Sequence, residues 1–175
     1  DSPRVKQAPE AYVDVQNTAS LLMRMELAGF EVGERWSGLV PLAESRLEDH
    51  TSPFTSIHAL IILAKSGMLE KARTMIGNML AFTDLDQGAI GNTYRQVVVP
   101  AAEAVLAFVE DKPKQVLERL MPIRFLLYRM GGSHAQRDLF WQMMTLTAFQ
   151  LEDRTLLGQL HSEIQDFGFS AMEQR

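Results

Sequence analysis

The chain has 175 residues, of which 46% are hydrophobic and 22% charged, and its formal net charge is -5. These values are ordinary for a soluble globular domain with a substantial core. Basic residues are scattered singly, and phosphate binding needs a concentrated basic surface, so we expect no nucleic-acid partner. No apolar run reaches the roughly 18 residues of a membrane span, so we expect no membrane partner.

The chain contains no cysteine, which excludes disulfides, thiolate metal sites and cysteine nucleophiles. This composition is compatible with the cytoplasm, where we expect the protein to act. The first eleven residues contain Pro3 and Pro9 and are interpreted as a linker or lead-in. A single domain is predicted over 12–175. Because the sequence starts at Asp1 without a methionine, we expect the C-terminal part of a longer protein.

Apolar residues at spacings of three and four predict amphipathic helices through most of the domain. The expected ranges are 12–28, 33–48, 54–65, 69–82, 94–110, 116–130, 134–151 and 154–167. The polar stretch 83–93 is predicted to be a loop, and the tail after Gly168 to fray. Pro100 is expected either to kink its helix or to start its main segment, and Pro122 to bend the next one. No stretch shows the alternation typical of a strand.

The link between 116–130 and 134–151 predicts a helical hairpin. Gly131 and Gly132 suit a helix end in the left-handed conformation, which a side chain opposes. Ser133 is expected to cap the following helix, with Gln136 completing a capping box. Two apolar-faced helices joined by so short a link must fold back on each other.

Small and apolar residues indicate a repeat. Packing positions of a tetratricopeptide repeat are matched approximately by Ala59, Leu63, Gly67, Ala72, Ile76 and Leu80. Part of this pattern recurs 44 positions later, at Asp111, Val116 and Leu120. We therefore predict an all-α fold, an α-α superhelix of about four stacked antiparallel helix pairs with degenerate TPR-like repeats and a concave face.

Seven segments carry a resemblance to a known family. They are 14–22, 26–29, 32–36, 49–50, Phe54 with His58 and Ala59, 120–124, and 131–138. Together they resemble the C-terminal portion of the tetratricopeptide repeat protein 38 family. The resemblance implies a helical repeat fold and protein binding, and it implies no catalytic residue.

Candidate binding residues lie on three of the predicted helices, and His58 is the one on the helix over 54–65. His134, Arg137, Asp138 and Trp141 share one stripe, on which His134 is expected to pair with Asp138 and Arg137 to lie over Trp141. The stripe is either a recognition patch or a polar network that pins the hairpin to its neighbour, and we favour the network. Asp14 and Asn17, with Arg24 and Glu26, pose the same choice on the first helix.

Two catalytic interpretations are disfavoured. The run 131–135 resembles the small-x-Ser-x-small elbow of serine hydrolases, but that elbow needs a strand before the serine and a parallel sheet. Ser133 is better explained as a helix cap. His50 and His58 are separated by Pro53, and His134 and His161 are distant in sequence, so no metal or other cofactor is expected.

The function predicted from the sequence is non-catalytic protein–protein interaction. A peptide or partner helix would bind the concave groove, and the acidic balance suits a basic or amphipathic ligand. Apolar surface uncovered at the N-terminal end would favour self-association. The alternative is an enzyme or small-molecule-binding protein with a polar pocket around His58, His134, Arg137 and Asp138.

Overall fold

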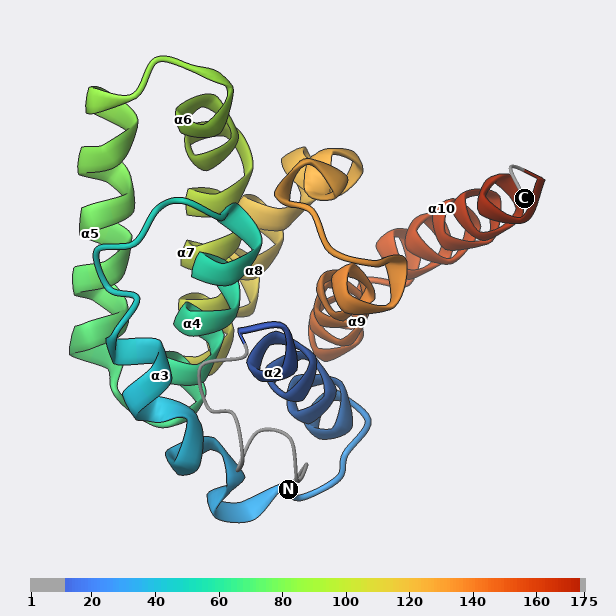
Figure 1. Cartoon of the computed structure of the whole chain (residues 1–175). Helices are drawn as coiled ribbons and strands as arrows, with labels where there is room; N and C mark the ends of the chain where they lie inside the picture. The colour runs from blue at the N-terminus through green and yellow to red at the C-terminus, as the bar shows by residue number, and fades with distance from the viewer. Residues whose placement is uncertain (1–11, 174–175) are drawn as a thin grey trace.

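The computed structural model describes residues 12–173, and every regular element within them is helical (Figure 1). The predicted all-α class is therefore confirmed. Residues 1–11, where the linker was predicted, lie outside the described residues. The α-helices are α2 (Tyr12–Leu27), α3 (Val40–Glu44), α4 (Pro53–Lys65), α5 (Leu69–Leu85), α6 (Ala89–Thr93), α7 (Val99–Val109), α8 (Pro113–Leu120), α9 (His134–Gln150) and α10 (Arg154–Glu173). Two 3₁₀ helices, η1 (Gly33–Leu39) and η3 (Met121–Met130), and a π-helical turn, η2 (Tyr94–Val98), complete them.

One type of turn recurs at Gly29, Gly67, Asp111 and Glu152. The φ angle is positive at all four positions, between 54° and 85°. At each, the amide N–H donates to the carbonyl three residues earlier, and the next N–H donates to the carbonyl five residues earlier. This is the Schellman ending of a helix. It ends the first helix of four hairpins: α2 with η1, α4 with α5, α7 with α8, and α9 with α10. The predicted equivalence of Gly67 and Asp111 is thus confirmed at the backbone.

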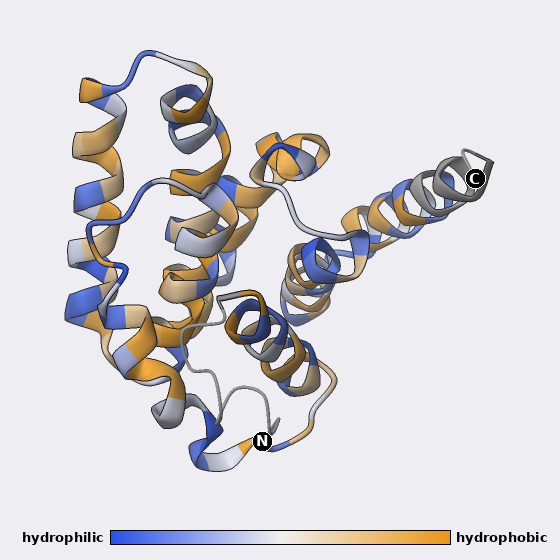
Figure 2. Ribbon diagram, viewed as in Figure 1, coloured by the Kyte–Doolittle hydropathy of each residue, from blue (hydrophilic) through white to orange (hydrophobic). Residues whose placement is uncertain are grey.

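Helix α4 lies at the centre of the molecule and contacts α2, α3, α5 and α7. Every residue from Ser56 to Ala64 is buried. The sequence explains this burial, because α4 is apolar on nearly all sides (Figure 2). A helix of this kind is stable only when other elements pack around it on all sides. Pro53 begins the helix, and the Ser52 hydroxyl accepts a hydrogen bond from the Thr55 amide.

The predicted loop over 83–93 is wrong for most of its length. Helix α5 continues to Leu85, and α6 begins at Ala89. The carboxylate of Asp86 causes the second helix to start, because it accepts hydrogen bonds from the amides of Gly88 (2.7 Å) and Gly91 (2.9 Å). A Cβ at Gly91 would lie 1.9 Å from the Asp86 carbonyl oxygen, so glycine is there for close packing and not for flexibility.

The two prolines act differently. Pro100 starts the main segment, because α7 begins at Val99 and the wide π-helical turn η2 precedes it. Pro122 ends the α-helical geometry: α8 stops at Leu120, and η3 continues as a 3₁₀ helix. The single helix expected over 116–130 is therefore two.

Two further helix ends differ from the prediction. The helix expected to reach position 48 stops at Glu44 and is 3₁₀ over its first half. Helix α10 continues to Glu173, past Gly168, where fraying was expected.

The first hairpin contacts the last one. Helix α9 packs against α2 as well as α8, η3 and α10, while α10 extends away from the body of the molecule (Figure 1). The Gln136 side-chain amide donates to Asn17 Oδ1 at 2.8 Å, which joins the two hairpins across the fold. In a strictly linear array each unit touches only its neighbours. The contact between α2 and α9 is therefore not expected of a strictly linear array.

Candidate functional site

The predicted stripe on α9 faces a pocket of about 340 Å³. All four of its residues line this pocket. The remaining lining residues come from α2, η3, the start of α9 and α10: Arg24, Arg124, Phe125, Leu127, Tyr128, Ala135 and Ile164. Periodicity therefore placed these side chains correctly on one face, and the fold brings three other elements to that face.

A second, more apolar hollow of about 460 Å³ adjoins the first and shares Asp138, Trp141 and Ile164 with it. It continues along the same helix past Thr145 and Leu146 to Phe149. We call the two hollows together the α9 groove. From His134 to Phe149 the groove follows about four turns of helix, or about 22 Å. Large apolar side chains lie open along it, including Tyr128 (60% exposed) and Phe149 (69% exposed).

The basic side chains in the groove have unequal partners. Arg124 donates to both carboxylate oxygens of Glu163, at 2.8 and 2.9 Å, and lies 4.3 Å from the centre of the Phe125 ring. These hydrogen bonds raise the pKa of Arg124 and lower the pKa of Glu163. No carboxylate among the described residues forms an ion pair with Arg24 or Arg137. Among the described residues, the groove therefore holds two guanidinium groups that no carboxylate pairs with.

The side-chain pairs predicted within the stripe are wrong. Arg137 donates to the carbonyls of Gly131 and Gly132 instead of lying over Trp141, and burial lowers its pKa. Asp138 accepts a hydrogen bond from Gln142, one turn further along, and not from His134. His134 itself is exposed at the start of α9. Arg137 thus stabilises the turn formed by Gly131 and Gly132, because it bonds carbonyl oxygens that make no hydrogen bond within a helix.

Ser133 is a helix cap, as predicted. Its hydroxyl accepts a hydrogen bond from the Gln136 amide at 3.3 Å, and its own amide donates to Gln136 Oε1 at 2.7 Å. The element before the glycines is the 3₁₀ helix η3 and not a strand. The strained strand-to-helix turn of a hydrolase elbow is therefore not formed at this serine.

Asp14 and Asn17 on α2 lie outside the groove lining, whereas Arg24 on the same helix lines the first hollow. Asn17 bonds Gln136, so it holds α2 against α9. Asp14 accepts a hydrogen bond from the Thr18 hydroxyl through its backbone carbonyl. Glu26, which follows on the same helix, accepts from the Trp36 indole at 2.9 Å and pairs with Lys65 at 2.6 Å. Asn17 and Glu26 thus join α2 to other elements, in agreement with the structural interpretation, whereas Arg24 bonds, among the described residues, only a carbonyl of its own helix.

His58 does not join His134, Arg137 and Asp138. It lies in the core on α4, 1% exposed, with its ring 4.2 Å from that of Phe54 and its Nδ1 2.8 Å from the Phe54 carbonyl oxygen. Burial lowers the pKa of His58 to about 4, so the ring is neutral at pH 7. It borders a separate, more polar hollow of about 250 Å³. The four-residue pocket of the alternative hypothesis is therefore not formed.

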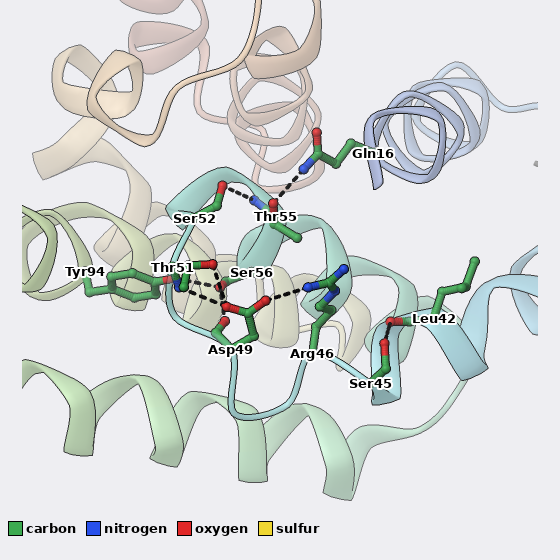
Figure 3. Close-up of polar contacts among 10 residues, drawn as sticks. All are labelled: Gln16, Leu42, Ser45, Arg46, Asp49, Thr51, Ser52, Thr55, Ser56 and Tyr94. Carbon is green, nitrogen blue, oxygen red and sulfur yellow. Dashed lines mark hydrogen bonds and ion pairs between the residues drawn. The ribbon is translucent and has the colours of Figure 1, made fainter. Parts of the chain in front are cut away.

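A polar cluster not predicted from the sequence joins α4 to η2 (Figure 3). Asp49 accepts hydrogen bonds from the Thr51 hydroxyl (2.6 Å), the Thr51 amide (3.0 Å) and Arg46 (2.6 Å). The hydrogen bond from the Thr51 hydroxyl, followed by that from the Thr51 amide, contributes most to lowering the pKa of Asp49 to about 2. Ser56 donates to the Asp49 carbonyl and lies 2.6 Å from the Tyr94 hydroxyl, whose pKa burial raises to about 12. These groups bind one another, so the cluster is structural.

Comparison with known proteins gives no assignment: no family model matches the chain, and no solved structure matches it. Among the described side chains, those of residues 13–166, no group of three or more His, Asp or Glu is placed to hold a metal ion. In the same part of the chain, none of the helices combines the length and apolarity needed to cross a membrane.

Proposed function

We propose that the chain is a non-catalytic, TPR-like helical repeat domain that binds a segment of a partner protein in the α9 groove. The observation that carries this proposal is the groove itself, a continuous, largely apolar surface built on rigid helices. Exposed apolar surface of this kind on a folded domain is typical of an interaction site. Its length of about 22 Å suits about four turns of a partner helix.

Two side chains are suited to anchor such a partner. Phe149 and Tyr128 lie toward opposite ends of the groove and are the most exposed aromatic residues that line it. Aromatic side chains in a hollow are the usual centres of binding energy. Two polar side chains of the groove are used in holding the fold, since Arg124 bonds Glu163 and Asp138 bonds Gln142. This arrangement favours binding over catalysis.

The resemblance to the tetratricopeptide repeat protein 38 family and a cytoplasmic location remain part of this proposal. The recurring Schellman turn supports the repeat interpretation. Several segments of the resemblance also meet in the fold. Asn17 bonds Gln136, and a Cβ on Gly132 would strike the Phe54 ring, so these segments specify contacts between hairpins.

Selection from a random peptide library on the immobilised protein tests the proposal. We expect enriched peptides that bind the unmodified protein and lose binding to Phe149→Glu, which places a charge in the groove. Phe30→Glu is the matched control, because Phe30 is 62% exposed but lines neither hollow. Peptides that bind both variants equally, or no enrichment at all, would refute docking in the groove.

A small amphipathic molecule is the second candidate ligand. The 340 Å³ pocket falls at the lower end of the range for small-molecule sites, about 300–1,000 Å³, and combines aromatic walls with arginines. Native mass spectrometry of the protein purified under mild conditions tests this candidate. A bound mass that is lost in Tyr128→Glu would support it, and a spectrum of the protein alone would count against it.

A further inference from the structure

We infer that the partner segment is acidic as well as apolar, with a carboxylate that binds between Arg24 and Arg137 at one end of the α9 groove. This inference rests on the proposed function and names the chemistry of its ligand. It reverses the expectation from composition, because the chain as a whole has a net charge of -5. A ligand in a groove responds mainly to the charges lining it, since more distant surface charges are screened within about 8–10 Å.

The two arginines reach the pocket from different hairpins. Arg24 comes from α2, and Arg137 comes from the first turns of α9. Arg24 makes one long hydrogen bond, from Nε to the Ser20 carbonyl at 3.4 Å. Arg137 uses Nη1 for both of its glycine carbonyls. Because a guanidinium carries five N–H donors, each arginine keeps donors for a ligand carboxylate.

The remaining charges of the groove do not cancel this pair. Arg124 is already neutralised by its two bonds to Glu163. Asp138 is the only carboxylate among the described residues that line the two hollows, and it lies on the stretch that they share. Two uncompensated positive charges therefore face one negative charge. A basic segment would place like charges beside Arg24 and Arg137.

Apolar surface next to the arginines defines the rest of the ligand. Phe125, Tyr128 and Ile164 line the same pocket, and each is at least 38% exposed. The second hollow is more apolar still and ends at Phe149. A ligand that fits both parts is an amphipathic segment whose apolar side follows α9 and whose acidic residue lies near the start of that helix.

Three synthetic amphipathic helical peptides test the inference. They share one face of Leu and Phe and differ only in their flanking residues, which are Glu, Gln or Lys. Fluorescence anisotropy at low salt should rank the affinities Glu, then Gln, then Lys. Arg24→Gln should weaken the affinity for the Glu peptide by about threefold, which is the contribution of one partly exposed charge pair. The same variant should change the affinity for the Gln peptide by less than that for the Glu peptide, because the Gln side chain carries no charge.

Arg35→Gln is the matched control. Arg35 likewise bonds one backbone carbonyl, that of Val32, but it lines neither hollow. It should not change the binding of any peptide. Equal affinity for all three peptides, or a preference for Lys, would overturn the inference while leaving the groove as a docking site. Failure of all three to bind, or undiminished binding to Phe149→Glu, would overturn the proposed function and this inference together.

Discussion

Replacing Gly132 by alanine tests the packing that shapes the α9 groove. The Gly132 φ is +76°, and an added Cβ would lie 2.2, 2.5 and 2.8 Å from three atoms of the Phe54 ring. That ring has little freedom to move, because Phe54 is 9% exposed and packs on His58. The substitution therefore forces either the turn or the ring out of place.

The expected loss has two parts. A left-handed conformation costs a residue with a side chain about 1–2 kcal/mol. Overpacking against a buried ring adds about 1–3 kcal/mol. We therefore expect Gly132→Ala to lower the free energy of unfolding by about 2–5 kcal/mol. Gly29→Ala separates the two parts, since its φ is +85° but nothing lies within 4 Å of the new Cβ. It should cost only the first part.

Urea unfolding followed by circular dichroism measures both variants. A further variant, Phe54→Leu, removes the ring atoms that the new Cβ would meet. Gly132→Ala should cost about as much as Gly29→Ala in that background. If Gly132→Ala is no more destabilising than Gly29→Ala in the unmodified protein, then the glycine turn does not pack on Phe54 as described.

Three further predictions concern turns, caps and pH. Asp111→Gly should stabilise the protein by about 0.5–1 kcal/mol, because the φ of Asp111 is +54°, which glycine adopts readily. Glu118→Gly inside α8 should instead destabilise the protein by about 1 kcal/mol. Urea unfolding measures the change in the free energy of unfolding for both variants. Ser133→Ala should cost about 1 kcal/mol, and a fluorophosphonate should not label the unmodified protein; labelling that Ser133→Ala abolishes would revive the hydrolase interpretation. The pKa of Asp49 is lowered from 3.8 to about 2, so its contribution of about 1–2 kcal/mol is complete above pH 3.8 and lost as the pH falls toward 2. Asp49→Asn should flatten that part of the stability–pH curve, and an unchanged slope would contradict the assignment.

Local sequence signals were sufficient for much of the fold. Hydrophobic periodicity, together with helix start and stop signals, predicted α2, α4 and the start of α9 nearly to the residue. The signals at Gly29, Pro53 and Ser133 are reliable because each residue starts or ends the helix directly beside it. The repeat was found only in part. The 44-residue offset matched Asp111 to Gly67, but Glu152 occupies the same left-handed turn position without a glycine and was not predicted.

Contacts between distant segments were not predictable in the same way. Nothing in the periodicity of α2 indicates that Asn17 bonds Gln136, so the packing of α2 against α9 was not predicted. The stripe on α9 was found, but its partners were not. Gly131 and Gly132 predicted a turn of positive φ, but not that its carbonyls would accept hydrogen bonds from Arg137. The sequence did contain a signal that His58 is buried. It lies within an apolar run on α4, which indicates burial in the core and not a place in an exposed site.

The indole N–H signals of the two tryptophans offer the most direct test of docking in the groove. Trp141 lines both hollows, whereas Trp36 is buried elsewhere and donates to Glu26. The chain has no other tryptophan, so each NMR signal can be assigned by a single substitution. Titration with the Glu-flanked peptide should shift the Trp141 signal and leave that of Trp36 in place. Measurable binding that moves Trp36 alone, or neither signal, would contradict the assignment of the docking site to the α9 groove.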